Sequence, residues 1–195
     1  VGMQCVAHGV HVLVEKPLAP TVEAADRILR AQGDGVFVQT GHVERFNQAV
    51  LAAEAFLDGP LFVESHLMAP FTPRSTDVAV VLDLMIHDVD LVTSLVGAPM
   101  TEFAASGVRV LTSSVDIANA RIRFASGCIA NLTASRISRE SVRKFRCFQP
   151  NMYVSVDAGA RELEVWRLTR RDGERPHIEG GAVPVPAGEP LEREL

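Results

Sequence analysis

Cysteine is scarce in this sequence. The 195 residues include only Cys5, Cys128 and Cys147, which are far apart and form no Cys-x-x-Cys pair. An odd number of widely spaced cysteines argues against a disulfide framework and against a thiolate zinc site. Unpaired thiols are typical of proteins kept in a reducing compartment, so we expect a cytoplasmic location.

Long apolar runs and an excess of positive charge are also missing. The 24 acidic residues outnumber the 19 basic ones, and a net charge of -5 disfavours general attraction to nucleic acid or anionic lipid. The apolar run at residues 78–86 falls well short of the roughly 20 residues that a membrane helix needs. The chain starts at Val1 with no secretory signal pattern, and we expect it to be cut from a longer one. Since 47% of the residues are hydrophobic, the chain can bury a sizeable core.

The first part of the chain alternates between helical and strand patterns. We expect the end of a helix at 1–9, a buried parallel strand at 10–14, a helix at 21–30 with Thr21 as N-cap, and a strand at 36–39. This order is typical of a doubly wound α/β sheet. Residues 1–42 are therefore predicted to be the C-terminal remnant of a Rossmann domain.

The remaining residues, 43–195, predict an α+β domain. The expected elements are a helix at 45–57 ending at Asp58-Gly59-Pro60, a strand at 61–68, a loop at 69–76, a helix at 77–95 closed by Gly97, strands at 103–111, 115–124, 128–134, 142–148, 153–157 and 163–169, and a tail from 172 that is a loop until a helix starts at Pro190. Short strands separated by turn residues indicate a mostly antiparallel, open-faced sheet with helices on one face.

Glu15-Lys16-Pro17 follows the first predicted strand directly. Open α/β sheets bind ligands in the crevice at the carboxyl ends of their strands, so Lys16 is predicted to point at a ligand. A solvated Glu-Lys pair at a strand end is the alternative that the tripeptide alone leaves open.

A polar stripe crosses the predicted helix at 77–95. At about 100° per residue, Asp83, His87, Asp90 and Ser94 fall within about 60° of one another, among mostly apolar neighbours. Burying such groups is unfavourable unless they are paired or face a wet cleft. Asp83 is expected to bond to His87, fixing its tautomer and raising its basicity as a general base requires. Asp88 lies about 100° from His87 and suits a cap, an interface or solvent better.

Two other interpretations of this stripe remain open. It could be a satisfied core Asp-His pair, or it could be a metal site. Two carboxylates and one histidine on a single helix need a fourth ligand from elsewhere, so we assign no metal.

Two further groups could meet a substrate. Arg45 and Asn47 follow the second predicted strand and could contact substrate oxygens, although Asn47 could equally be the N-cap of the next helix. The dense basic cluster could hold a phosphate or pyrophosphate, or could be a solvated sheet face or subunit contact; it consists of Arg136, Arg139, Arg143, Lys144 and Arg146.

Three motifs together resemble the Gfo/Idh/MocA family of NAD(P)-dependent sugar and inositol dehydrogenases. They are His-Val-Leu-Val-Glu-Lys-Pro-Leu-Ala at 11–19, Gly41-His42 with Arg-Phe-Asn at 45–47, and Asp-Leu-Met-Ile-His-Asp-Val-Asp at 83–90. The resemblance implies an enzyme that uses NAD or NADP and forms a homo-oligomer, a dimer or tetramer. It implies these roles: catalysis by Lys16, Asp83 and His87, cofactor binding by Glu15, Lys16 and Pro17, and substrate binding by Arg45, Asn47, Asp90 and Arg136.

Within the family, the residues around Asp83–Asp88, Ser135-Arg136 and 146–150 are most similar to the UDP-N-acetylglucosamine 3-dehydrogenase subgroup. This implies oxidation of the 3-hydroxyl of a UDP-N-acetyl amino sugar. The competing hypothesis is a non-catalytic sheet domain for dimerisation or ligand binding.

The sequence departs from the family pattern in three places. No Gly-x-Gly-x-x-Gly occurs, the helix expected after residues 189–191 is missing, and Gln48 stands where a proline commonly follows the asparagine. We therefore expect a fragment, or the ordered part of a longer protein, that by itself binds NAD(H) poorly.

Overall fold

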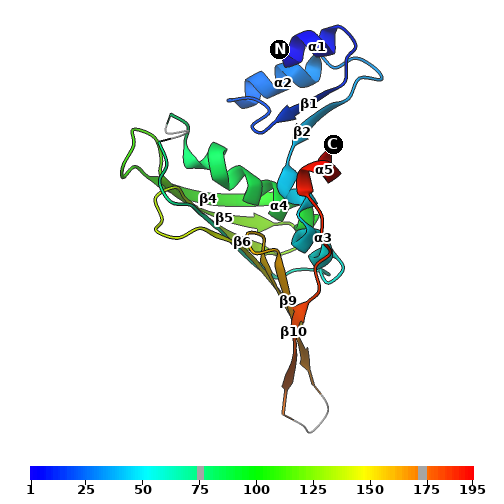
Figure 1. The fold of residues 1–195 in the computed structure, drawn as a ribbon, viewed down its shortest axis with the longest axis vertical. Helices are drawn as coiled ribbons and strands as arrows, with labels where there is room; N and C mark the ends of the chain where they lie inside the picture. The colour runs from blue at the N-terminus through cyan, green and yellow to red at the C-terminus, as the bar shows by residue number, and fades with distance from the viewer. Residues whose placement is uncertain (74–76, 171–174) are drawn as a thin grey trace.

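The computed structural model describes residues 1–73, 77–170 and 175–195. They form a small unit with a two-stranded parallel sheet and a larger unit built on an eight-stranded sheet (Figure 1). Parts of the predicted loop at 69–76 and of the predicted tail from 172 lie outside the described residues. Within the described part of the chain, no helix is long and apolar enough to cross a membrane.

The small unit contains α1 (Gly2–Ala7), β1 (Val12–Glu15), α2 (Val22–Arg30) and β2 (Val38–Gly41). The two strands pair in parallel, from Val12 opposite Val38 to Glu15 opposite Gly41. The predicted cap is confirmed, because the Thr21 hydroxyl accepts a hydrogen bond of 3.2 Å from the amide of Ala24. The order of elements agrees with the last part of a Rossmann fold, and Glu15 and Lys16 lie at the carboxyl end of β1, as expected.

The larger unit begins with short helices. It starts with the 3₁₀ turn η1 (Val43–Phe46), α3 (Gln48–Glu54) and β3 (Phe62–Met68), followed by the π-helical turn η2 (Val81–Met85) and α4 (Ile86–Val96). Gly97 ends α4 with φ of 62°, a left-handed conformation that glycine adopts without strain.

Seven further strands and a terminal helix complete the unit. They are β4 (Met100–Val108), β5 (Ile117–Phe124), β6 (Ile129–Ser135), β7 (Val142–Gln149), β8 (Met152–Asp157), β9 (Glu162–Thr169), β10 (His177–Val183) and α5 (Pro190–Glu194). The sheet order is β10-β9-β8-β7-β3-β6-β5-β4. All neighbours are antiparallel except β3 and β6, which confirms the expected mostly antiparallel sheet.

Alternation along the strands places the core on one face of the sheet. In β6, Ala130, Leu132 and Ala134 are buried, whereas the residues between them are only partly covered. The buried residues pack against Val50 of α3 and Val92 of α4. Helices therefore cover one face, and the other face is open (Figure 1).

The structure corrects the predicted helix boundaries. The helix expected at 45–57 is a 3₁₀ turn followed by α3, because Asn47 caps α3 and interrupts the helical run. The helix expected at 77–95 is regular only from Ile86, after the π-helical turn of η2.

The strands also differ from the prediction in two places. β4 ends at Val108 because the chain then bends around Asp116, whose carboxylate accepts hydrogen bonds from the amides of Val110, Leu111 and Thr112. β10 was predicted as loop because of its two glycines. It pairs with β9 instead, and a side chain at Gly180, where φ is 149°, would meet the backbone oxygen of Val165.

Candidate active site

The two units meet through Lys16 and Asp83. The Lys16 ammonium donates a hydrogen bond of 2.5 Å to the backbone carbonyl of Asp83 and lies 3.8 Å from its carboxylate. Lys16 thus extends from the tip of β1 to the π-helical turn that precedes α4. Lys16 therefore contacts one residue of the polar stripe, Asp83, whereas other residues line the cavity that His87 borders.

The expected hydrogen bond between Asp83 and His87 is wrong. The Asp83 carboxylate instead faces two cations, Lys16 and Arg136, the latter at 4.0 Å. The buried Nδ1 atom of His87 has no hydrogen-bond partner among the described residues. A carboxylate is attracted more strongly to two cations than to a neutral imidazole. The positions of Lys16 and Arg136 therefore explain why Asp83 does not bond to His87.

The environment of His87 keeps its imidazole neutral. The pKa of His87 is lowered to about 4, chiefly by burial and also by the charges of Lys16, Arg143 and His42, whereas Asp90 opposes the shift. Asp83 therefore does not raise the basicity of His87, contrary to our expectation. A neutral imidazole near pH 7 can accept a proton, so a base of this kind is available without that aid.

Arg136 helps to hold Asp83 in place. Its guanidinium donates a hydrogen bond of 2.5 Å to the backbone carbonyl of Val78, and only 5% of the residue is exposed. The predicted substrate contact at Arg136 would have to be made from this buried position beside Asp83.

Arg45 and Asp90 bind one another. The Arg45 guanidinium donates two hydrogen bonds of 2.6 Å, one to each carboxylate oxygen of Asp90, and His42 Nδ1 lies 3.6 Å from the same carboxylate. Such a two-bond pair fixes η1 against α4. Both residues were predicted to bind substrate, and neither carboxylate oxygen of Asp90 remains without a partner.

Asn47 caps α3. Its side chain accepts a hydrogen bond from the amide of Ala49 and donates one to the carbonyl of Ala158, both of 3.1 Å. The residue is 5% exposed. The alternative of an N-cap is therefore confirmed, and a substrate contact at Asn47 stays a prediction that these two hydrogen bonds do not favour.

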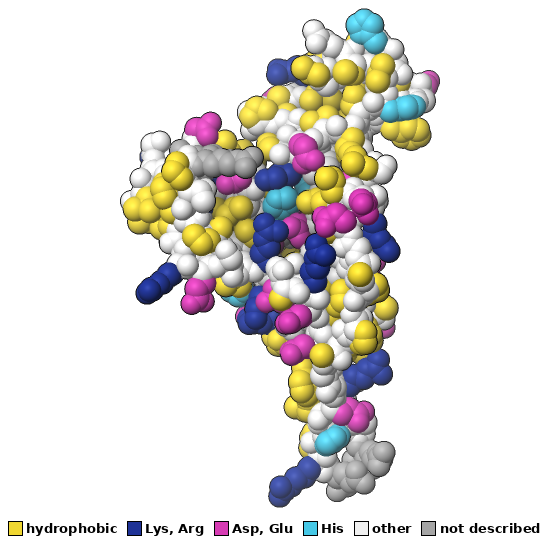
Figure 2. All heavy atoms as spheres, viewed as in Figure 1, with side chains coloured by type: hydrophobic (Ala, Val, Ile, Leu, Met, Phe, Trp, Pro, Cys, Tyr) yellow, Lys and Arg dark blue, Asp and Glu magenta, His cyan; other side chains and the backbone are white. Residues whose placement is uncertain are grey.

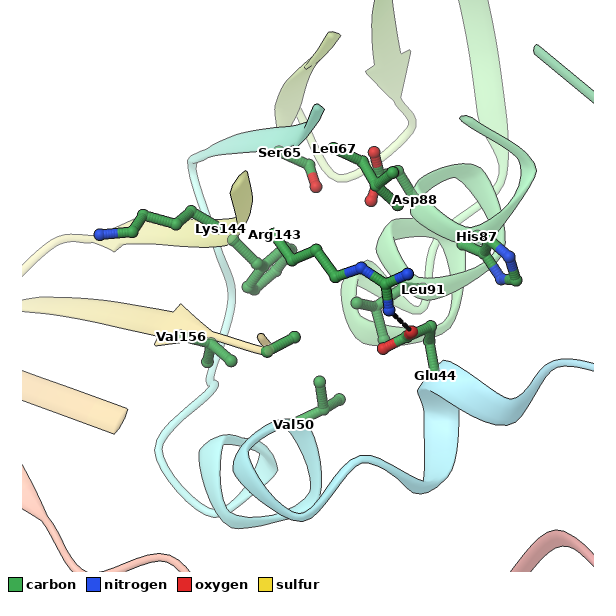
Figure 3. Close-up of a pocket in the computed structure, with 12 residues that line it drawn as sticks. Glu44, Val50, Ser65, Leu67, His87, Asp88, Leu91, Arg143, Lys144 and Val156 are labelled. Atoms are coloured by element: carbon green, nitrogen blue, oxygen red, sulfur yellow. Dashed lines mark hydrogen bonds and ion pairs between the residues drawn. The ribbon is translucent and has the colours of Figure 1, made fainter. Parts of the chain in front are cut away.

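Two cavities border α4. The larger, of about 540 Å³, lies between the loop after β1 and the helix, with Pro17 and Leu18 on one side and Ile86, Val89 and Asp90 on the other. The smaller, of about 20 Å³, holds roughly one water molecule and is lined by residues of α4, α3, η1 and the sheet (Figure 3). His87 borders the smaller cavity and Asp90 the larger, so the predicted polar stripe is divided between them.

Asp88 is buried and lines the small cavity, although the sequence did not identify it as a site residue. It is 6% exposed and one of its carboxylate oxygens has no partner among the described residues. The pKa of Asp88 is raised to about 7, chiefly by burial and also by Glu44, whereas a hydrogen bond with Ser65 and the charge of Arg143 oppose the shift. Helical spacing placed Asp88 about 100° from His87, outside the polar stripe. Its burial depends on the packing of the helix against the sheet, which helical spacing does not predict.

Asp88 should make stability depend on pH. The folded chain holds the Asp88 proton more tightly than the unfolded chain, whose aspartate pKa is about 4, so stability falls as pH rises between about 4 and 7. In the full-length protein, Asp88→Asn should remove this loss. The free energy of unfolding of Asp88→Asn, relative to that of wild type, should increase by about 2 to 3 kcal/mol from pH 5 to pH 8, which means that the variant gains stability relative to wild type.

Denaturant titrations at the two pH values check this prediction. Asp26→Asn, on the exposed surface of α2, is the matched control and should show no such trend. If the difference in free energy of unfolding between Asp88→Asn and wild type were the same at both pH values, the raised pKa of the buried Asp88 carboxyl would be contradicted.

The predicted basic cluster is divided by the alternation of β7. Arg143 shares a face with the buried residues Phe145 and Cys147 and points toward the helices, whereas Lys144 points away (Figure 3). Arg146, on the same face as Lys144, pairs with Glu64 at 3.5 Å. The cluster as a whole is therefore not one phosphate site.

Charged side chains gather where the two units meet. Lys and Arg side chains lie beside Asp and Glu around a histidine in the middle of one face of the molecule (Figure 2). Within the described ranges, no group of three or more His, Cys, Asp and Glu side chains is placed to hold a metal ion. The arrangement offers a lysine, a neutral imidazole and paired carboxylates, which are groups for proton transfer and for stabilising a developing alkoxide.

Two protein-family models match the chain, and their boundaries agree with the two units of the fold. Residues 52–160 match the model of the GFO/IDH/MocA C-terminal domain, and residues 1–42 match that of the oxidoreductase family with an NAD-binding Rossmann fold. The chain belongs to the GFO/IDH/MocA family.

Several characterised proteins are similar to the chain. A UDP-N-acetylglucosamine 3-dehydrogenase of Acidithiobacillus ferrooxidans is 38% identical over 88% of this chain and 55% of its own length. The scyllo-inositol 2-dehydrogenase (NAD(+)) of Bacillus subtilis is 28% identical over 67% of this chain and 43% of its own. A solved structure of the Acidithiobacillus enzyme has a TM-score of 0.88 and 34% identity, covering 98% of this chain and 61% of that one. The chain thus spans about half the length of these curated relatives.

Proposed function

We propose that the full-length protein oxidises a hydroxyl of a sugar with a nicotinamide cofactor as hydride acceptor. The observation that carries the proposal is the contact of Lys16, at the tip of a Rossmann strand, with Asp83 beside a neutral His87. The family to which the chain belongs supports the same reaction class.

In this proposal His87 is the base. Its unprotonated nitrogen takes the hydroxyl proton, the electron pair of the broken O–H bond forms the C=O bond, and the hydrogen on the hydroxyl-bearing carbon leaves with the C–H electron pair as hydride, which a bound nicotinamide would accept. Lys16 orients the hydroxyl and stabilises the negative charge that develops on its oxygen. Asp83 holds the Lys16 ammonium in place from the helix side, with Arg136 behind it.

The residues of this chain fit a nicotinamide ring. The cavity beside the loop after β1 has mostly apolar walls from Pro17, Leu18 and α4, and its volume of about 540 Å³ falls within the usual range for a ligand site. Pro17 lines this cavity, and Glu15 and Lys16 directly precede it in the chain. These three residues would hold the ring side of NAD or NADP, which supplies the hydride acceptor when bound. Residues 1–42 form the cofactor-binding part in this proposal, and 43–195 the substrate and oligomerisation part.

We infer a UDP-N-acetyl amino sugar as substrate, oxidised at position 3. The 38% identity with a UDP-N-acetylglucosamine 3-dehydrogenase over most of the chain supports this choice over inositol. The full-length protein should reduce NAD or NADP with UDP-N-acetylglucosamine at least about tenfold more efficiently, as kcat/KM, than with myo-inositol. Absorbance of the reduced cofactor measures both rates. Faster cofactor reduction with myo-inositol would contradict the proposed substrate but would agree with the proposed reaction class.

We also propose that the protein is a cytoplasmic homo-oligomer. The open face of the sheet carries exposed apolar side chains, with Phe148 of β7 at 38% exposure and Trp166 of β9 at 36%. A face of this kind suits a second copy of the sheet. The three free thiols support a reducing compartment. Sedimentation of the full-length protein as a monomer would contradict the oligomer.

A further inference from the structure

Of the three basic-cluster residues in β7, Arg143 is the one on the side of the sheet where His87 lies. It extends from β7 between α4 and η1, with its guanidinium between His87 and Glu44 (Figure 3). Arg143 and His87 border the same small cavity, and the charge of Arg143 is among those that lower the pKa of His87. An arginine so near the proposed base can reach a bound substrate.

Glu44 holds Arg143 in an extended conformation. Arg143 Nη1 donates a hydrogen bond of 2.6 Å to Glu44 Oε1, and the Glu44 side chain is only 17% exposed. Half of the Arg143 side chain stays exposed. A guanidinium has five N–H donors, so most of them are free to bind a further acceptor. Glu44 thus orders the side chain without consuming its capacity to bind.

The charges around His87 favour an anion. Lys16, Arg143 and His42 are the basic groups that act on this imidazole. Of the acids nearby, Asp90 is bound to Arg45 and Glu44 to Arg143, and the buried Asp88 borders the same cavity. A neutral sugar such as inositol gains little from a second cation here. A substrate with a phosphate group gains charge-assisted hydrogen bonds, which are among the stronger ones in proteins.

We propose that Arg143 binds a phosphate of the nucleoside diphosphate portion of the substrate, and that Glu44 is the positioning residue for it. The inference rests on the proposed function for the identity of the sugar nucleotide. It adds a substrate-binding residue from β7, a strand in which no site residue was predicted individually.

The test compares Arg143→Gln with Arg146→Gln in the full-length protein. The two arginines lie three residues apart on one strand and each pairs with a glutamate, but Arg146 lies on the open face of the sheet. Calorimetry with UDP measures phosphate binding without turnover. Steady-state oxidation of UDP-N-acetylglucosamine then separates KM from kcat.

Arg143→Gln should raise the Kd for UDP and the KM for the sugar nucleotide by about 10- to 100-fold, with kcat changed less than about threefold. Arg146→Gln should stay within about twofold of wild type in both. Arg143→Lys keeps the positive charge but lacks the planar guanidinium with its paired N–H donors, so its increases in Kd and KM should be intermediate. It also keeps the test valid if Arg143→Gln folds poorly.

The outcomes separate this inference from the function on which it rests. If the sugar nucleotide is oxidised and UDP binds to Arg143→Gln and Arg143→Lys as to wild type, the inference is overturned and the proposed function stands. If UDP binding is lost in Arg143→Gln while the sugar nucleotide is not oxidised, the phosphate contact is supported and the proposed substrate is overturned.

Discussion

Lys16→Met in the full-length protein should lower kcat by about 10³-fold. Methionine keeps the length of the side chain and removes the ammonium, so the substrate hydroxyl loses its orienting donor and the alkoxide its nearest cation. The loss should appear in kcat more than in KM, because the charge on oxygen develops only in the transition state.

The chain contains one other lysine, which makes a matched control possible. Lys144 pairs with Asp157 at 3.4 Å and points away from the cavity at His87. Lys144→Met should keep kcat within about threefold of wild type. If Lys16→Met kept more than about a tenth of the wild-type kcat, the proposed catalytic role of Lys16 would be contradicted.

His87→Asn should lower kcat by a similar factor, about 10³-fold, because the hydroxyl proton then has no base to receive it. The wild-type enzyme should also show the state of the imidazole. Because the pKa of His87 is lowered to about 4, protonation of this group should reduce kcat/KM only near or below that pH, and not near the usual histidine value of 6.5.

Initial rates from pH 4 to pH 9 measure this limb, with His66→Asn as the matched control. His66 lies in β3 and is half-buried. His66→Asn should leave both kcat and the pH profile unchanged. If kcat/KM fell on lowering the pH with a midpoint near 6.5, and His87→Asn abolished that fall, the prediction that the His87 imidazole is neutral at that pH would be wrong.

Local sequence patterns predicted the parts of the site that depend on one element. The strand before Lys16 ends where its run of β-branched residues ends, so the position of Lys16 at the tip of β1 follows from the sequence alone. Thr21 was recognised as a cap in the same way, because an N-cap needs only a few neighbouring residues.

The side-chain partners could not be predicted, since they come from distant residues. Asp83 was assigned to His87 by helical spacing, but Lys16 comes from 67 residues away and competes successfully for it. The helix is also π-helical from Val81 to Met85, which a rule of 100° per residue does not represent. For Asn47, the cap and the substrate contact were equally compatible with the sequence.

Other details were present in the sequence but not used. The alternation of β7 places Arg143 on the face of Phe145 and Cys147, so strand periodicity separates it from Lys144 and Arg146. β10 was missed because Gly180 and Gly181 are typical of loops. Its pairing with β9 is a tertiary constraint that outweighs their low strand propensity.

The central claim is that Lys16 and His87 act on one hydroxyl. A crystal structure of the full-length protein with its nicotinamide cofactor and UDP-N-acetylglucosamine tests it most directly. We expect Lys16 Nζ and a ring nitrogen of His87 each within about 3.2 Å of the same sugar oxygen. A sugar bound with no hydroxyl in reach of both side chains would contradict the account.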